Sequence, residues 1–174
     1  PRDRLWSALG NYMGTAEDFF GGLASFAGAI VAIGDNKARA RFGRRLTETG
    51  TSAPTIMHPA ASIGRSVEIG MGSVLLAGSV VVTGARVGMG CIVNTAASVD
   101  HDCRVGDWVH ISPGARLAGT VSVGDLSWIG LGAVVREGSV IGSEVIVGAG
   151  AVVVADVPPG TTVVGNPARP MQKS

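Results

Sequence analysis

The stretch "CIVNTAASVDHDCRVGDWVHISPGARL" (residues 91–117) carries an aliphatic residue at every sixth position. The spacing continues in both directions without an insertion and gives sixteen consecutive aliphatic positions. They are Ile63, Ile69, Leu75, Val81, Val87, Val93, Val99, Val105, Ile111, Leu117, Val123, Ile129, Val135, Ile141, Val147 and Val153. The residue two places before each of them is always Ala, Val, Ser or Cys. A fixed period of this kind is the signature of a repeat architecture.

The period of six predicts short strands that alternate with tight corners, with one large and one small side chain facing inward in each repeat. Gly follows the large residue in eight of the sixteen repeats, and we expect it to allow a positive φ in the turn. The pattern resembles the left-handed parallel β-helix of the hexapeptide-repeat acyltransferases, in which three hexapeptides form one coil. The handedness comes from this resemblance and not from the period. We therefore expect a mainly β protein with about five coils, in a prism roughly 25 Å tall.

The composition limits the classes of function. The 174-residue chain is 46% hydrophobic with only 5% aromatic residues, so its core must consist of small and branched aliphatic side chains. A net charge of +1 gives no electrostatic footprint for nucleic acid or an anionic membrane. We find no apolar run near the roughly 20 residues of a membrane span and no signal-peptide pattern, and we expect a cytoplasmic protein. Cys91 and Cys103 fall on the small inward track, which indicates core residues rather than reactive groups.

The ionisable residues of the repeat region concentrate at one corner. Asp100, His101 and Asp102 fall on a predicted turn, outside the packed interior. His110 follows nine residues after His101, half of a coil, on a strand position that points outward. The two histidines therefore lie on opposite sides of their own prism and could share a site only across a subunit boundary.

The coil also predicts which residue lies next to each histidine. Gly119 stands one coil above His101, where it leaves space beside the imidazole and offers a backbone N–H. Trp128 stands one coil above His110 and is expected to pack at a subunit interface rather than to contact a ligand.

Four motifs resemble one family closely: "VAIGDNKAR" (31–39), "VNTAASVDHDC" (93–103), "GDWVHISPGARLAG" (106–119) and "DVPPGTTVVGNPARPM" (156–171). Over roughly residues 27 to 171 the chain looks like the sugar acetyltransferases of the sialic-acid O-acetyltransferase and bacillosamine-pathway N-acetyltransferase group. The resemblance implies transfer of acetyl from acetyl-CoA to an amino or hydroxyl group of a sugar, expected to be nucleotide-linked. It also implies a homotrimer with the coenzyme in the groove between neighbouring prisms, and no metal.

The same resemblance implies roles for individual residues. His101 is the expected general base, Asp102 raises its basicity, and Asp100 completes the acidic triplet. His110 contacts acetyl-CoA, and Gly119 offers its N–H to the thioester carbonyl. Positions that line the coenzyme groove in the family match Leu131 and Ala149, and weaker matches to acceptor contacts are Ile33, Gly34 and Asp35.

Acetyl transfer needs these residue types on chemical grounds as well. A proton must leave the acceptor, and histidine has the side-chain pKa nearest neutrality for that task. A neighbouring carboxylate orients the ring and stabilises its protonated form. The tetrahedral oxyanion needs a hydrogen-bond donor. Because no Ser or Cys nucleophile is required, we predict direct transfer within a ternary complex.

The first 55 residues read as a partial α/β, Rossmann-like acceptor-binding domain, followed by the β-helix over 56–157 and a C-terminal cap and tail over 158–174. We expect a short helix opened by a capping box at Thr15 and Asp18, and a buried strand over 28–34. A second helix, capped at residue 35 or 36, should run to about residue 47 and end near 50, with a solvated basic face. That face comprises Lys37, Arg39, Arg41, Arg44 and Arg45. The family's opening strand and Gly-rich loop are not found in residues 1–50.

Two other classes of function compete with the acetyltransferase. Hexapeptide trimers include γ-class carbonic anhydrases, which bind zinc through three histidines, two of them five residues apart. The nine-residue spacing of His101 and His110 and the position of His58 before the repeat argue against zinc. A non-catalytic trimer that only binds a ligand stays open, because the N-terminal region departs from the family pattern.

Overall fold

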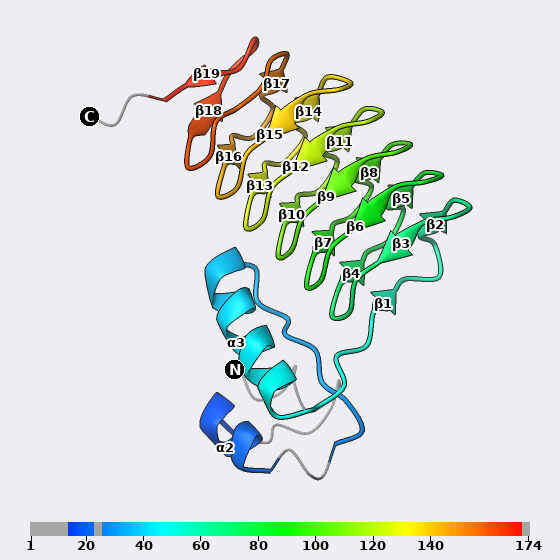
Figure 1. The fold of residues 1–174 in the computed structure, drawn as a ribbon, viewed down its shortest axis with the longest axis vertical. Coiled ribbons are helices and arrows are strands. Elements are labelled where there is room, and N and C mark those ends of the chain that lie inside the picture. Colours follow the sequence, from blue (N-terminus) through cyan, green and yellow to red (C-terminus); the bar gives the residue numbers. More distant parts are fainter. Residues whose placement is uncertain (1–13, 23–25, 172–174) are drawn as a thin grey trace, which may run out of the picture.

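The computed structural model describes residues 14–22 and 26–171, most of them in a solenoid of three parallel sheets (Figure 1). Two helices precede the solenoid, α2 (Ala16–Gly21) and α3 (Asn36–Glu48). The strands are β1 (Ile56–Met57), β2 (Ser62–Ile63), β3 (Glu68–Ile69), β4 (Val74–Leu75), β5 (Val80–Val81), β6 (Arg86–Val87), β7 (Ile92–Val93), β8 (Ser98–Val99), β9 (Arg104–Val105), β10 (His110–Ile111), β11 (Arg116–Leu117), β12 (Ser122–Val123), β13 (Trp128–Ile129), β14 (Val134–Val135), β15 (Val140–Ile141), β16 (Ile146–Val147), β17 (Val152–Val153), β18 (Thr162–Val164) and β19 (Arg169–Pro170).

From β1 to β14, each strand pairs in parallel with the strand three further along the chain, which makes three flat faces. Sheet A has the order β1-β4-β7-β10-β13-β16-β18-β19, sheet B β17-β14-β11-β8-β5-β2 and sheet C β15-β12-β9-β6-β3. His110 pairs with Ile92 on one side and Trp128 on the other, so one coil contains 18 residues. The architecture is that of the predicted left-handed parallel β-helix.

The ends of the solenoid extend beyond the six-residue period. Sheet A gains β1 before the first repeat and β18 after the last, so the solenoid is longer than the predicted five or so coils. β19 then runs antiparallel to β18, with Val163 opposite Pro170. This short strand covers the edge of sheet A, where unpaired backbone groups would otherwise invite pairing with another chain.

The inward aliphatic residues form one continuous core. Leu75 is fully buried and Val153 is 1% exposed, whereas Ile63 in the first repeat is 39% exposed because little of the coil stack lies beneath it. Cys91 and Cys103 are buried and unpaired, as predicted for core residues. Burial raises the pKa of the Cys91 thiol to about 12, which keeps it protonated and unreactive.

The corners place a positive φ at a different position from the one expected. Every sixth residue from Ser66 to Gly150 has a φ between 55° and 72°, and it lies three places after the aliphatic residue. The glycines that follow the aliphatic residue do not adopt positive φ, so that expectation is wrong. They are required by close approach instead: a Cβ on Gly124 would lie 2.5 Å from the backbone nitrogen of Ser143 on the next coil.

The helices of the N-terminal region begin where the sequence predicts. Thr15 opens α2 with a reciprocal capping box, in which Asp18 Oδ2 accepts from the Thr15 backbone N–H at 2.7 Å. Asp35 caps α3 by accepting from the Ala38 N–H at 2.7 Å.

The predicted strand over 28–34 is wrong. The segment forms no strand, and it makes one backbone hydrogen bond to a distant described residue, from Ala29 N to Ser52 O at 2.9 Å. A strand needs a neighbouring strand to satisfy its backbone, and none lies beside this segment in the described part of the chain. The three domain boundaries stay predictions, and residues 1–13 and 172–174 lie outside the described residues.

α3 packs along the solenoid edge between sheets C and A (Figure 1). The Arg39 side chain is 1% exposed, and its guanidinium donates to the carbonyls of Gly90 (2.8 Å) and Trp108 (2.9 Å). Asn36 donates to the carbonyl of Ser127 at 3.0 Å. The prediction that Arg39 belongs to a solvated face is therefore wrong, because its donors satisfy carbonyls at the helix–solenoid contact.

Trp108 fills the space between α3 and this edge. It is 7% exposed and occupies a corner position with a φ of 59°. The helix reaches the ring because Gly43 has no side chain: a Cβ there would lie 2.6 Å from Cζ3 of Trp108. The contact fixes how the N-terminal region lies against the β-helix.

Candidate active site

The turn Asp100–Asp102 joins β8 to β9, at the edge between sheets B and C. Nδ1 of His101 lies 3.0 Å from Oδ2 of Asp102, and the two side chains are 56% and 59% exposed. Asp100 accepts a hydrogen bond from the backbone N–H of His101 at 2.8 Å. The two acids therefore differ: Asp102 orients the imidazole, whereas Asp100 supports the turn.

Asp102 occupies the positive-φ position of this corner, with a φ of 58°. Aspartate is one of the few residue types that tolerate this conformation. A Cβ on Gly84, one coil below, would lie 2.6 Å from Oδ1 of Asp102. Arg104 Nη1 donates to the Gly84 carbonyl at 2.9 Å and so ties the two corners together.

Gly119 lies one coil above His101, as the period predicts. A Cβ on Gly119 would come within 2.6 Å of Cε1 of the imidazole and closer still to Nε2. The His101 carbonyl accepts from Thr120 N at 2.8 Å, which holds the two corners in register. Nε2 therefore faces the Gly119 backbone, whose N–H has no hydrogen-bond partner among the described residues.

His110 lies on β10 in sheet A, the face opposite this edge. Its ring is 4.2 Å from the ring of Trp128, and Nε2 lies 3.0 Å from Nδ2 of Asn94. The side chain points out of the prism as predicted but is only 7% exposed, because it packs against Trp128 and Asn94 and lies beside the backbone of Gly34. Burial, together with the Arg39 charge, lowers the pKa of His110 to about 4. One chain therefore does not bring His101 and His110 together.

The predicted acceptor residues gather near His110 and Trp128. Arg39 Nη1 donates to the carbonyls of Ile33 (2.9 Å) and Gly34 (2.8 Å), which fixes the course of this segment. A cavity of about 280 Å³ opens beside it. Its lining comprises Asp35, Asn36, Lys37, Leu126, Trp128, Glu144 and Ile146.

The other predicted coenzyme residues lie on the edge between sheets A and B. Leu131 is 60% exposed, and Ala149 is exposed at the same position one coil above. The Leu131 carbonyl accepts from Gly150 N at 2.8 Å, which stacks the two corners. Sheet B separates this edge from the His101 edge.

No protein-family model and no curated protein sequence matches the chain. Solved structures do match. The acetyltransferase domain of PglB from Neisseria gonorrhoeae, in complex with acetyl coenzyme A, is 42% identical over 92% of this chain and 83% of its own, with a TM-score of 0.85. PerB from Caulobacter crescentus, in complex with CoA and GDP-perosamine, is 40% identical over 88% of this chain and 75% of its own, with a TM-score of 0.87. WeeI from Acinetobacter baumannii is 35% identical over 82% of this chain and 69% of its own, with a TM-score of 0.79.

The chain belongs to the hexapeptide-repeat sugar N-acetyltransferases. The predictions of this family and of an acetyl-CoA-dependent sugar acetyltransferase are thereby confirmed.

The three histidines of this acetyltransferase lie at three different places in the solenoid. His58 lies directly after β1, before the first repeat, and its Nδ1 accepts from the backbone N–H of Ala60 at 3.0 Å. Within residues 14–22 and 26–171 there is no group of three or more His, Cys, Asp or Glu side chains that could hold a metal ion. The described residues also contain no helix long and apolar enough to cross a membrane.

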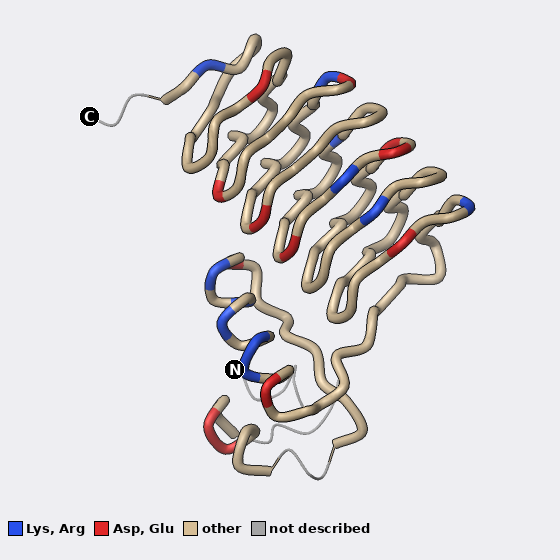
Figure 2. Tube along the Cα trace, viewed as in Figure 1, with Lys and Arg blue, Asp and Glu red and all other residues tan. Residues whose placement is uncertain are grey.

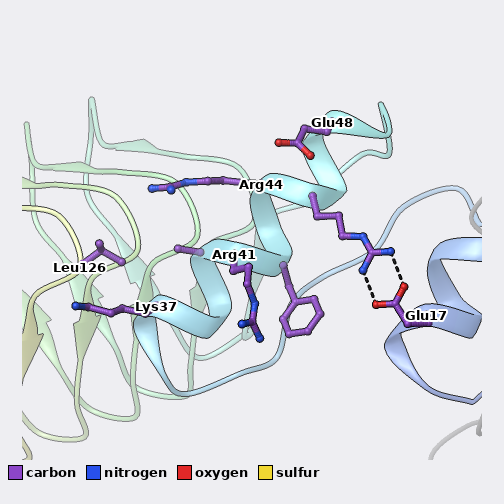
Figure 3. A pocket seen from close by; sticks show the side chains of 9 residues that line it. Glu17, Lys37, Arg41, Arg44, Glu48 and Leu126 are labelled. Carbon is purple, nitrogen blue, oxygen red and sulfur yellow. Dashed lines mark hydrogen bonds and ion pairs between the residues drawn. The ribbon is translucent and has the colours of Figure 1, made fainter.

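The basic residues of α3 border a separate cavity of about 590 Å³, which Glu17 of α2 and Leu126 of the solenoid also line (Figure 3). Arg45 forms an ion pair with Glu17, and Lys37 pairs with Glu144 on the solenoid. Figure 2 shows the concentration of positive charge along α3 and of negative charge at several solenoid corners. Apart from Arg39, the predicted solvated face is confirmed for this helix by its exposed or partly exposed side chains.

The sequence patterns do not predict the contacts of four residues that lie between α3 and the solenoid or beside His110. The basic pattern of α3 places Arg39 on the solvated face, and nothing in the pattern predicts the contact between Trp108 and Gly43. The motif of residues 93–103 contains Asn94 but does not predict its contact with His110. A signal existed only for Asn94, which stands one coil below Ser112, at the carboxyl end of the strand beside His110.

Proposed function

We propose that the protein transfers the acetyl group of acetyl-CoA to the amino group of a nucleotide-linked sugar, by direct attack and with His101 as the general base. The proposal depends on one observation, the exposed imidazole of His101. Its Nδ1 lies within hydrogen-bond distance of Asp102, and its Nε2 faces the backbone of Gly119. The relatives that bind acetyl-CoA, or CoA with GDP-perosamine, support the choice of substrates.

The proton is transferred as follows. The acceptor amine attacks the thioester carbonyl while His101 Nε2 takes the proton from the nitrogen, a contribution of roughly 10²–10⁴-fold. Asp102 stabilises the imidazolium that forms. The N–H of Gly119 donates to the oxyanion, worth on the order of 10²–10³-fold in kcat. The carbon–sulfur bond then breaks, and the departing CoA thiolate takes a proton from the imidazolium.

A second copy of the chain completes the site in this proposal. His101 lies on an exposed edge, whereas His110 and residues 33–35 lie at the opposite face, so both groups can contact one substrate pair only when two copies meet. Exposed apolar side chains are available for such a contact, since Leu131 is 60% and Ile146 51% exposed. We infer a homotrimer with active sites between subunits, located in the cytoplasm.

The test is a CoA-release assay with acetyl-CoA and a panel of nucleotide-linked sugars that carry an amine or a hydroxyl at the same carbon. We expect CoA release with the amines only, and loss of release in His101→Gln with the oligomer intact. Binding of acetyl-CoA without turnover on any acceptor would favour the non-catalytic trimer. An acetyl group trapped on the enzyme would contradict direct transfer.

A further inference from the structure

The Arg39 guanidinium connects the segment before α3 to the solenoid. Its Nη1 donates to the carbonyls of Ile33 (2.9 Å) and Gly34 (2.8 Å) in that segment. Its Nε donates to the carbonyl of Gly90 at 2.8 Å, and its Nη2 donates to that of Trp108 at 2.9 Å. The last two carbonyls belong to corners one coil apart, so one side chain ties the segment to two levels of the β-helix.

Every donor of this guanidinium has a partner. Arginine carries five N–H groups, and the fifth donates to Oδ1 of Asn36 at 2.7 Å. Asn36 in turn donates to the carbonyls of Leu126 and Ser127, both at 3.0 Å, one coil above Trp108. Arg39 is 1% and Asn36 5% exposed. A buried polar network whose members are all satisfied is rigid, so it holds its neighbours in one arrangement.

The segment held by this network lies where the proposed function places the acceptor. The Gly34 backbone lies beside His110, and Asp35 and Asn36 line the cavity of about 280 Å³ together with Trp128. Residues 28–34 form no strand, so no sheet fixes their position in the described part of the chain. The buried network is therefore the main polar connection that sets the height of the segment along the solenoid.

That height is defined relative to the coil of the general base. Trp108 stands on the next corner after His101, because only β9 lies between the two turns. In a cyclic assembly of parallel solenoids, equivalent coils of neighbouring copies lie at the same height. A segment anchored at Trp108 of one copy is thereby set against the coil that carries His101 in the next copy.

We propose that Arg39 is a positioning residue for the acceptor, which holds residues 33–35 at the height where the acceptor amine meets the base of a neighbouring copy. The inference rests on the proposed function for the identity of the acceptor and for the role of these residues. Because Arg39 is buried and its donors are all used within the protein, it acts through the segment and not by touching substrate. An error of about 1 Å in such a placement costs about 10²-fold in rate.

The first experiment compares the binding of the two substrates by calorimetry in wild-type protein and in Arg39→Lys. The probes are acetyl-CoA and the sugar nucleotide of the assay panel that binds wild-type protein most tightly. Lysine keeps the charge but has three donors and no planar fork, so it cannot serve five oxygens. We expect the Kd of the sugar nucleotide to rise about tenfold and that of acetyl-CoA to change less than about twofold.

The matched control is Arg44→Lys, on the exposed side of the same helix, which should leave both Kd values unchanged. Thermal unfolding shows whether each variant is folded. A folded Arg39→Lys with an unchanged Kd for the sugar nucleotide would overturn the inference. An equal rise in both Kd values would also overturn it, since a general loss of structure does not distinguish the two substrates.

The second experiment restores the missing group in Arg39→Ala. This change removes the guanidinium and leaves a space beside the five oxygens, and kcat/KM for the sugar nucleotide should fall about 10²-fold. Ethylguanidinium, at concentrations that do not unfold the protein, should recover part of this loss, whereas ethylammonium should not. Recovery of thermal stability without recovery of kcat/KM would contradict a positioning role. If Arg39→Ala does not fold, the binding data on Arg39→Lys decide the question.

The behaviour of the wild-type protein separates a failure of the proposed function from a failure of this inference. Binding of a sugar nucleotide without acetyl transfer would contradict the proposed function, while the Kd values of the Arg39 variants would still test the positioning role. Acetyl transfer by wild-type protein, together with wild-type Kd and kcat/KM values in Arg39→Lys, would overturn only the positioning role.

Discussion

The backbone of Gly119 lies directly over the imidazole of His101, one coil further along the solenoid. The two residues belong to adjacent corners, joined by the hydrogen bond from Thr120 N to the His101 carbonyl at 2.8 Å. The space above Nε2 exists only because residue 119 has no side chain. A base and a backbone N–H are thereby held together by the coil itself, without a flexible loop.

Gly119→Ala should reduce activity while preserving the fold. The new methyl group would occupy the space of the His101 ring, within 2.6 Å of Cε1, and would turn the exposed imidazole away. Misplacing a catalytic group by this much costs about 10²-fold in kcat/KM. The matched control is Gly21→Ala, where a Cβ meets nothing within 4 Å. Equal kcat/KM in the two variants would contradict the placement of the site at this corner.

Asp102→Asn separates charge from shape at the same corner. Asparagine tolerates the positive φ of 58°, so the turn should persist while the carboxylate beside Nδ1 is lost. We expect kcat/KM to fall about 10- to 100-fold, less than the loss in His101→Gln. Asp100→Asn, whose side chain supports only the backbone, should cost less than either. Steady-state kinetics of the three variants gives the order of their losses in kcat/KM. A larger loss in Asp100→Asn than in Asp102→Asn would mean that Asp100, and not Asp102, assists the imidazole.

Stability should fall in mild acid because His110 is buried as a neutral ring. Its pKa is lowered from 6.5 to about 4, so the folded state binds fewer protons than the unfolded state between these values. The contribution of the neutral His110 ring to the free energy of unfolding is complete above pH 6.5 and is lost as the pH falls towards 4. At pH 5 the loss should be about 2 kcal/mol, from the linkage between proton binding and folding. Urea unfolding at pH 7.5 and pH 5 measures the free energy of unfolding at each pH. In His110→Gln the difference between the two values should become smaller. An unchanged difference in that variant would mean that another group causes the acid sensitivity.

Gly43→Ala should destabilise the protein, against the usual preference for alanine in helices. In a helix interior the substitution normally stabilises by about 0.5–1 kcal/mol. Here the added Cβ would lie 2.6 Å from Cζ3 of Trp108, and overpacking costs about 1–3 kcal/mol. Thermal unfolding of the variant measures the sign. Trp108→Leu makes room for the methyl group, so in a Trp108→Leu protein the further change Gly43→Ala should no longer destabilise. A loss of stability on adding Gly43→Ala to Trp108→Leu would contradict the proposed contact.

Much of the site was predictable because it follows from the six-residue period. The spacing places His101 on a corner, Gly119 above it and His110 on the opposite face. These positions depend only on counting along a regular coil, in which each residue repeats its environment after 18 residues. The positive-φ position could not be predicted from glycine alone. Several repeats have another residue there, among them Ser66, Trp108 and Glu144.

The sequence by itself determined the solenoid, its core and the corner that carries His101, since a repeated local pattern specifies a repeated local structure. Only the tertiary structure decided how α3 lies on the solenoid and why His110 is buried and neutral. Those features depend on single contacts between residues far apart in the chain, such as Arg39 with Gly90, 51 residues later. Such contacts leave no period to count, because each is made once and depends on where two separately folded elements meet.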